Sequence, residues 1–180
     1  MEKVVPLEAL VEQRAAWSDA GRRVVFTNGA FDLLHVGHVR YLQAARALGD
    51  LLIVGLNDDA SVRGYKGPGR PLVPATERAE LLAALACVDY VVLFGEPTAT
   101  RLVTALAPDV YAKGGDYSGG GDSAGKPLPE AAAARAGGGE VVIVPFVPGR
   151  STTGLIERIA AVARWTEREA AGRGRGEAAD

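Results

Sequence analysis

Short runs of β-branched and other apolar residues alternate along the chain with segments in which apolar residues recur at helical spacing. The first pattern is typical of buried strands and the second of amphipathic helices. Five strands are predicted, at residues 23–27, 51–56, 90–94, 109–113 and 141–146. Helices are predicted between them, at residues 39–48, 76–86, 98–107 and 130–136, and outside them, at residues 7–20 and 155–164. This alternation predicts an α/β fold: a doubly wound, five-stranded parallel sheet covered by helices on both faces.

The same pattern predicts the domain organisation. A chain of 180 residues fits one domain of ordinary size. We expect an N-terminal helix within residues 1–21, where Gly21 ends the helix, followed by one domain over residues 22–165. Residues 166–180 mix Gly, Arg, Glu and Ala without an apolar period, which predicts a frayed helix end followed by a disordered tail.

Two stretches, residues 64–74 and 114–129, have the composition of loops. Long connections in a compact domain tend to be lids or binding loops, and we favour such a role for the first. For the second, a binding loop and simple drift in a sequence rich in Ala and Gly stay equal alternatives. Residues 120–126 match most of a P-loop, but Pro127 and Pro129 stand where a Ser or Thr and a helix should follow. We therefore reject that motif.

Composition excludes several classes of protein. Apolar residues at 48% and charged residues at 23% are ordinary globular values. A net charge of −2 gives no basic footprint for nucleic acid. No apolar run approaches the length of a membrane span and no signal-peptide core is present, so we expect a cytoplasmic protein with no membrane partner. Cys87 is the only cysteine and lies in an apolar helical stretch, where a packed thiol is expected.

The strongest chemical signal follows the first predicted strand. Both histidines of the chain, His35 and His38, lie in the run FTNGAFDLLHVGH at residues 26–38. One such histidine is ordinarily a buried or capping residue, but two of them spaced H-x-G-H at a strand-to-helix turn weaken that interpretation. Gly37 lets the backbone approach a ligand, and the N-terminus of the next helix offers free N–H groups. This turn is therefore a predicted phosphate site.

This run resembles the H-x-G-H nucleotidyltransferases, a superfamily that includes the cytidylyltransferases. Within it, the sequence is most similar to the D-glycero-β-D-manno-heptose 1-phosphate adenylyltransferases. The similarity spans roughly residues 22–160, which makes a chance match remote. Its further landmarks are NDDAS at residues 57–61, KG at 66–67, RP at 70–71, ER at 77–78, KGGDY at 113–117 and STT at 151–153.

Topology predicts where these landmarks meet. Ligands of doubly wound sheets bind at the carboxyl ends of strands, beside the point where the strand order reverses. In the expected Rossmann-like order 3-2-1-4-5, that point lies between the first and fourth strands. The loop with both histidines, the segment 113–116 after the fourth strand and the segment 151–153 after the fifth should therefore line one crevice.

The resemblance implies a role for each landmark residue. The implied catalytic residues, which would contact the shifting phosphate charge, are His35, His38, Lys66 and Arg78. The implied nucleotide-binding residues are Asn28, Gly29, Ala30, Phe31, Gly37, Lys113, Gly115, Asp116, Ser151, Thr152 and Thr153. The implied residues for the sugar phosphate are Asp32, Lys66 and Arg70, of which Lys66 is the better supported.

Ordinary structural roles stay open for several of these residues. Arg78 shares a helical face with Leu81, Leu82 and Leu85, so its stem could follow the core while its head reaches water. Lys66 and Arg70 could be solvated surface charges. Ser151 to Thr153 form first of all a helix N-cap, which is compatible with phosphate binding. Asp116, Asn28 and Asp32 could serve only to shape turns.

The implied reaction needs no protein nucleophile. A sugar 1-phosphate oxygen attacks the α-phosphorus of ATP, and pyrophosphate leaves with Mg²⁺ carried on the phosphate oxygens, so no protein metal site is expected. The product with heptose 1-phosphate would be ADP-heptose. Alternatives are cytidylyl transfer to glycerol 3-phosphate or another small phosphate, and a nucleotide-binding module without turnover.

The resemblance also carries expectations about partners. It suggests a homodimer, and a separate heptose kinase would supply the sugar 1-phosphate. One feature departs from the wider superfamily. Its cytidylyltransferases carry an arginine about five residues before the STT segment, where this chain has Phe146. Arg150 directly precedes Ser151, and whether it substitutes stays open.

Overall fold

The computed structural model describes residues 3–115, 128–145 and 147–173, with side chains up to Trp165. The chain divides into two compact units, Met1–Val147 and Pro148–Asp180. The domain expected over residues 22–165 stays a prediction. Pro148 and Gly149, whose φ is 69°, interrupt regular structure between β5 and α7.

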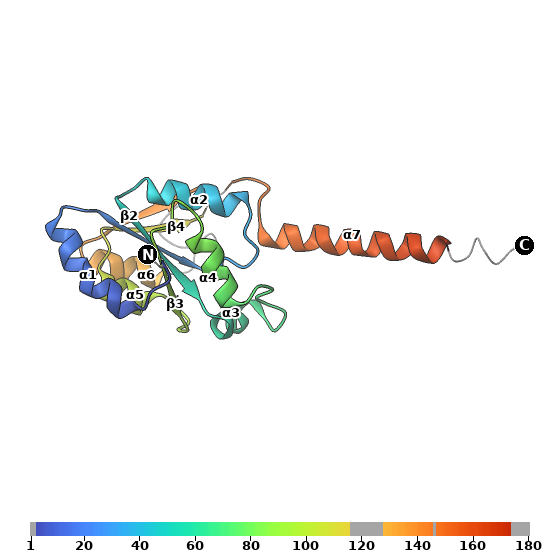
Figure 1. Cartoon of the computed structure of the whole chain (residues 1–180), viewed down its shortest axis with the longest axis horizontal. Helices are drawn as coiled ribbons and strands as arrows, with labels where there is room; N and C mark the ends of the chain where they lie inside the picture. The colour runs from blue at the N-terminus through green and yellow to red at the C-terminus, as the bar shows by residue number, and fades with distance from the viewer. Residues whose placement is uncertain (1–2, 116–127, 146, 174–180) are drawn as a thin grey trace, which may run out of the picture. The chain divides into compact units, whose positions relative to one another are not determined.

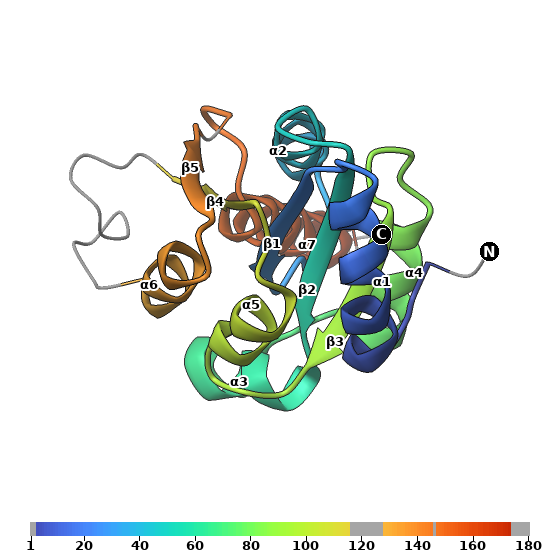
Figure 2. The ribbon, with the colours of Figure 1, turned by 90° about the vertical axis from the view of Figure 1, so that its left-hand side faces the viewer.

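The first unit holds a parallel five-stranded sheet in the order β3-β2-β1-β4-β5, which confirms the predicted fold and order. Figure 2 shows this order across the sheet, with α5 and α6 on one side and α2 and α4 on the other. The strands are β1 Val24–Gly29, β2 Leu51–Asn57, β3 Tyr90–Phe94, β4 Val110–Gly114 and β5 Glu140–Val144. The predicted strands agree with these bounds to within two residues at each end.

The helices of the first unit connect the strands, as Figure 1 shows by colour along the chain. They are α1 Leu7–Asp19, α2 Val36–Arg46, α3 Asp59–Lys66, α4 Ala75–Ala83, α5 Thr100–Leu106 and α6 Pro129–Ala136. The predicted helices correspond to all of these except α3. Among the described residues, no helix is long and apolar enough to cross a bilayer.

Alternate residues of the central strands point to opposite faces of the sheet, because side chains alternate along a strand. Val24 and Phe26 of β1 pack in the cluster that contains residues of α1, α5 and α6. Val25, between them, packs in the cluster that contains residues of α2 and α4. The β1 and β2 strands are therefore buried on both faces, and their polar residues gather at the strand ends. Cys87 packs against the second cluster, as expected, and burial raises the pKa of its thiol.

The segment after β2 differs from the prediction. Residues 64–66 were expected in a loop, but they form the last turn of α3. Asp58 caps this helix, because its Oδ1 accepts the Ser61 N–H at 2.7 Å, and Gly67, with a φ of 91°, ends it. Lys66 therefore projects from the C-terminal end of a helix, which fixes its backbone.

The second unit contains α7, Thr152–Arg173. Ser151 Oγ accepts the Gly154 N–H at 3.0 Å, which is the predicted N-cap. The helix extends past Trp165, where the tail was expected to begin, because Glu, Arg and Ala are strong helix formers even without an apolar period. Residues 174–180, and the rejected P-loop run at 120–126, lie outside the described residues.

Candidate active site

The two histidines lie where β1 passes into α2. His35 is the N-cap residue of α2, with extended backbone, and its carbonyl accepts the His38 N–H at 2.9 Å. This spacing places the two imidazoles on one side of the first turn. Their rings stack, with centroids 3.9 Å apart and an angle of 18° between their planes. A stacked pair at the N-terminus of a helix presents ring nitrogens and backbone N–H groups to the same ligand.

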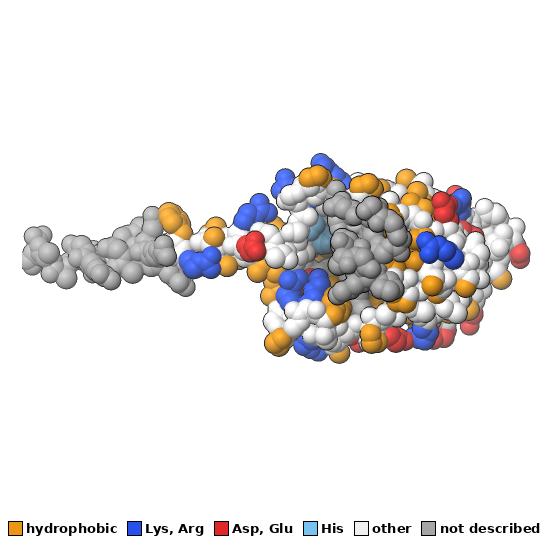
Figure 3. Space-filling model, turned by 180° about the vertical axis from the view of Figure 1, so that it is seen from behind, with side chains coloured by type: hydrophobic (Ala, Val, Ile, Leu, Met, Phe, Trp, Pro, Cys, Tyr) orange, Lys and Arg blue, Asp and Glu red, His pale blue; other side chains and the backbone are white. Residues whose placement is uncertain are grey.

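His38 is uncharged at neutral pH. Partial burial, the neighbouring His35 and the positive charge of Lys66 lower the pKa of His38 from 6.5 to about 4. Its Nδ1 is buried without a hydrogen-bond partner in the described part of the chain. In Figure 3 histidine side chains (pale blue) are visible at the surface, with Lys and Arg side chains (blue) on the same face. An anionic ligand would therefore gain both a donor and a favourable charge here.

Residues of β4 form a second wall, as the strand order predicts. Tyr111 Oη donates to Asn28 Oδ1 at 2.8 Å, and Lys113 Nζ donates to the same oxygen at 3.4 Å. Asn28 therefore connects the ends of β1 and β4, and its amide oxygen is used by protein donors. The Gly115 N–H donates to the Val144 carbonyl at 3.1 Å, which ties the end of β4 to β5. Tyr111 carries no motif in the sequence, so its part in the site could not be predicted.

Arg70 and Asp32 form a buried pair beside the histidine loop. Arg70 Nε donates to Asp32 Oδ2 at 2.6 Å, and the Asp32 side chain is 1% exposed. Burial alone would raise the pKa of Asp32, but hydrogen bonds from the Val73 N–H, Arg70 and the Leu72 N–H outweigh it and hold the pKa below its usual value. One terminal nitrogen of Arg70 is buried without a partner among the described residues. Arg70 can therefore still donate to a ligand.

Lys66 adds a second cation near the histidines. Its ammonium lowers the pKa of His38, so the two groups interact electrostatically. Partial burial first, and then the positive charge of Arg70, lower the pKa of Lys66 itself. Neighbouring cations of this kind favour the binding of an anion.

Arg78 does not reach water, as one of the two predicted arrangements required. Its side chain is fully buried, and its contact with a ligand stays a prediction. It donates to the carbonyls of Val73, Ala30 and Asn57 and pairs with Asp59 at 2.7 Å. The predicted apolar stripe also changes, because Leu81 is 48% exposed while Leu82 is buried. This geometry makes Arg78 a structural centre that joins the ends of β1 and β2 to the segment before α4.

The structure does not place several of the predicted residues relative to this site. Asp116 lies outside the described residues. Ser151, Thr152 and Thr153 belong to the second unit, so their approach to the crevice stays a prediction. Gly29, Ala30 and Gly37 lie in the histidine turn and its flanks, as expected.

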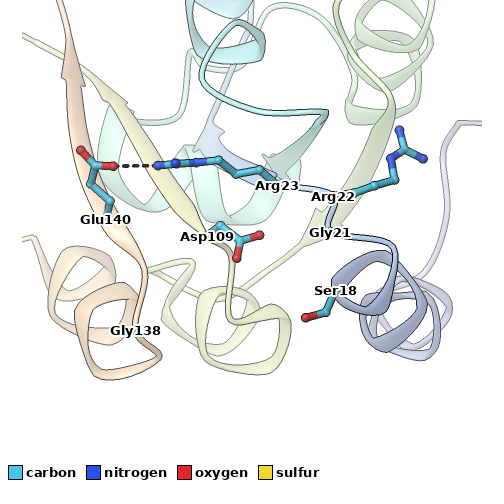
Figure 4. A pocket seen from close by; sticks show the side chains of 7 residues that line it. All are labelled: Ser18, Gly21, Arg22, Arg23, Asp109, Gly138 and Glu140. Atoms are coloured by element: carbon cyan, nitrogen blue, oxygen red, sulfur yellow. Dashed lines mark hydrogen bonds and ion pairs between the residues drawn. The ribbon is translucent and has the colours of Figure 1, made fainter.

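The amino edge of the sheet holds a different pocket, of about 410 Å³. Figure 4 shows its lining: Ser18, Gly21, Arg22, Arg23, Asp109, Gly138 and Glu140. Arg23 pairs with Glu140 at 2.7 Å, and Asp109 pairs with Arg14 at 3.1 Å. Its charges are largely balanced by each other, and doubly wound folds bind ligands at the opposite edge, so we do not assign the nucleotide to this pocket.

Across the described ranges, no three His, Cys, Asp or Glu side chains gather in a way that could hold a metal ion.

Comparison with known proteins agrees with this geometry. The family described as Cytidylyltransferase-like matches residues 26–121. The bifunctional protein HldE of Trichlorobacter lovleyi is 54% identical over 93% of this chain and 32% of its own length. The HldE protein of Syntrophotalea carbinolica is 58% identical over 77% of this chain and 27% of its own length. The chain thus spans about a third of the length of these curated relatives.

A solved structure agrees as well. The lipopolysaccharide core biosynthesis protein from Thermoplasma volcanium GSS1 superposes with a TM-score of 0.56 and 30% identity, over 71% of this chain and 98% of that one. The resemblance drawn from the H-x-G-H run is therefore confirmed. Since the family match covers more than half of the chain, the chain belongs to the cytidylyltransferase-like family and is a nucleotidyltransferase.

Proposed function

We propose that this nucleotidyltransferase transfers the adenylyl group of ATP to D-glycero-β-D-manno-heptose 1-phosphate, giving ADP-heptose and pyrophosphate. The observation that carries the proposal is the stacked pair of His35 and His38 at the start of α2, beside the cations Lys66 and Arg70. Such a cluster suits a triphosphate, whose negative charge it would neutralise.

The chemistry is an in-line displacement. An oxygen of the sugar 1-phosphate attacks the α-phosphorus, the new P–O bond forms, and the bond to the β-phosphate oxygen breaks to release pyrophosphate. The nucleophile is already an anion, so no protein side chain has to remove a proton. Catalysis then comes from positioning the two substrates and from stabilising the charge that moves onto pyrophosphate.

His35 and His38 donate to the α- and β-phosphate oxygens in this proposal. His38 is uncharged before the nucleotide binds, and the approach of phosphate favours its protonated form, because an anion raises the pKa of a neighbouring imidazole. Lys66 and Arg70 oppose the remaining negative charge and contact the sugar phosphate. We reassign Arg78 and Asp32 as positioning residues, because each is buried and its polar atoms are used within the protein.

Mg²⁺ enters with the triphosphate in this proposal and, when bound, neutralises charge on the leaving pyrophosphate. The nucleotide itself would lie across the ends of β1 and β4, against Asn28, Gly29, Ala30, Phe31, Gly37, Lys113, Gly115 and Asp116. Ser151, Thr152 and Thr153 stay predicted phosphate ligands in this proposal, and Ser151 caps the start of α7.

Two observations support the heptose substrate. The run at residues 26–38 resembles heptose 1-phosphate adenylyltransferases more than cytidylyltransferases that use glycerol 3-phosphate. The solved relative from Thermoplasma volcanium is described as a lipopolysaccharide core biosynthesis protein, a role that uses activated sugars. A kinase that phosphorylates the anomeric oxygen must supply such a substrate, and we propose that the enzyme acts in the cytoplasm as a homodimer.

Pyrophosphate release, measured with ATP and CTP against a panel of sugar and polyol phosphates, tests the proposal. We expect turnover with ATP and heptose 1-phosphate that exceeds turnover with every other pair. Preference for CTP and glycerol 3-phosphate would assign the enzyme to the cytidylyltransferase alternative. No release with any pair, together with tight nucleotide binding in calorimetry, would favour a binding module without turnover.

A further inference from the structure

Phe31 occupies a backbone conformation that residues with a side chain rarely adopt. Its φ is 43°, in the left-handed region, and it lies between the end of β1 and the histidines. A bulky residue in this region costs free energy and persists only where neighbouring contacts enforce it. The contacts that flank Phe31 must therefore hold this conformation.

The backbone on both sides of Phe31 is fixed by buried groups. The carbonyl of Ala30 accepts a hydrogen bond from the Arg78 guanidinium. On the other side, Asp32 Oδ1 accepts the N–H of Val73 at 3.0 Å, and the Val73 carbonyl accepts from Arg78 Nε at 2.8 Å. These bonds form a closed ring through Ala30, Asp32, Val73 and Arg78, which we name the clasp. Phe31 lies between Ala30 and Asp32 within the clasp, so its backbone has little freedom.

The ring of Phe31 meets His38 edge-on. The two ring centroids are 5.5 Å apart, at an angle of 62°, and Phe31 is 6% exposed. The ring also lies against Gly29, since a Cβ built on Gly29 would stand 3.1 Å from Phe31 Cε2. The ring therefore packs against both Gly29 and His38.

We propose that Phe31 is a positioning residue for His38, and that the clasp holds its unfavourable backbone conformation so that the ring orients and desolvates the imidazole. The role of His38 in phosphate transfer rests on the proposed function. The placement of the ring does not, because it concerns the protein before any substrate binds. Two buried charged residues, Asp32 and Arg78, thereby hold the backbone on either side of a strained residue.

Imidazole titration in the ligand-free protein tests the inference directly. The chain has only two histidines, so NMR resonances of the imidazole C–H groups can be assigned with one variant, His35→Gln. The wild-type midpoint of His38 is expected at about 4. In Phe31→Ala, water reaches the ring, and the midpoint should rise toward 6.5, the value of an unperturbed histidine. An unchanged midpoint in a folded Phe31→Ala protein would overturn the inference.

A matched pair of substitutions separates the ring from the backbone. Phe31→Gly removes the ring and relieves the left-handed backbone, whereas Phe31→Ala removes the ring and keeps the strain. Both should raise the His38 midpoint by the same amount, and the Gly variant should have the higher Tm. A Gly variant less stable than the Ala variant would contradict the strained backbone. Phe31→Leu, which keeps apolar bulk, serves if both smaller variants fail to fold, and it should raise the midpoint less.

The clasp is tested through Asp32→Asn. This change keeps an oxygen for the Val73 N–H but opposes a donor to the Arg70 Nε–H, so the loop should loosen. We expect the His38 midpoint to rise in this variant, although residue 32 does not touch the imidazole. Turnover of the pair that the enzyme uses should fall about tenfold or more with little change in the KM of the triphosphate. A His38 midpoint unaffected by Asp32→Asn would remove the clasp from the inference, whatever the substrate is.

Discussion

The amino and carboxyl edges of the same sheet carry similar polar residues and use them in opposite ways. At the amino edge, aspartates accept the N–H groups that begin the strands: Asp109 binds the Val24 N–H at 2.7 Å and Asp89 the Leu52 N–H at 2.8 Å. Each aspartate also pairs with an arginine, Asp109 with Arg14 and Asp89 with Arg46. The polar groups named here are used within the protein, and they stabilise the fold.

At the carboxyl edge, two buried polar groups lack partners among the described residues, and we propose that this edge binds the ligand. His38 Nδ1 and one terminal nitrogen of Arg70 are buried without partners in the part of the chain that the structure describes. Burial first, and then the positive charge of Arg70, lower the pKa of Lys66 there. Leaving such groups unsatisfied costs stability, which a bound anion would restore. The two edges therefore differ in what their polar groups do. Those at the amino edge stabilise the fold, whereas we propose that those at the carboxyl edge serve binding.

The largest expected effect comes from Arg78, which stabilises the fold at the ligand edge. Arg78→Ala should lower the free energy of unfolding by about 3–5 kcal/mol, because it leaves the Asp59 carboxylate and three buried carbonyls without their donor. Urea unfolding followed by circular dichroism measures the loss. Arg78→Lys is the control, since it keeps the charge and should lose less. A loss below about 1 kcal/mol, the range of an exposed pair, would contradict the structural role.

His38→Ala is expected to separate activity from stability. Turnover should fall roughly a hundredfold, about 3 kcal/mol in the barrier, because a donor to the shifting phosphate charge is lost. The Tm should change little, since the Nδ1 has no protein partner to lose. Steady-state pyrophosphate release and calorimetric unfolding give the two quantities. Wild-type turnover in this variant would refute the assignment.

Asp109→Ala is the corresponding change at the amino edge. It removes the acceptor of the Val24 N–H and the partner of Arg14, so stability should fall by about 1–3 kcal/mol. The kcat should not change, because the residue lies at the opposite edge from the histidines. Asp109→Asn, which keeps one acceptor oxygen, should lose less. A large fall in kcat at a temperature where the variant is fully folded would break the distinction between the edges.

The smallest effect is expected from the exposed pair at the mouth of the amino-edge pocket. Arg23 and Glu140 are 48% and 62% exposed in their side chains, so solvent screens their attraction. A double-mutant cycle of Arg23→Ala and Glu140→Ala should give a coupling of about 0.2–1 kcal/mol that falls at high salt. A coupling well above this range would show that the pocket is more than a surface hollow.

Periodicity and motif predicted much of this molecule before any coordinates. The apolar runs fixed the five strands because burial on both faces requires continuous apolar residues, and alternation with helices required a parallel sheet. The H-x-G-H run located His35 and His38 because its residues are neighbours in sequence. The predicted strand order brought β4 beside β1, and Asn28 and Lys113 meet at the ends of these strands. Residues whose placement follows from local sequence or from strand order could therefore be predicted.

Features that depend on contacts between residues distant in sequence could be known only from the tertiary structure. Nothing in the local pattern shows that Arg78 binds three carbonyls and Asp59, because these partners come from three separate segments. The same holds for Asp32, whose partners begin at residue 70, and for the left-handed backbone of Phe31 that the clasp enforces. Sequence determined the fold and the candidate site residues His35 and His38, because both follow from local patterns. The residues that hold them in place emerged only from packing, because buried donors and acceptors must be satisfied wherever the chain brings them together.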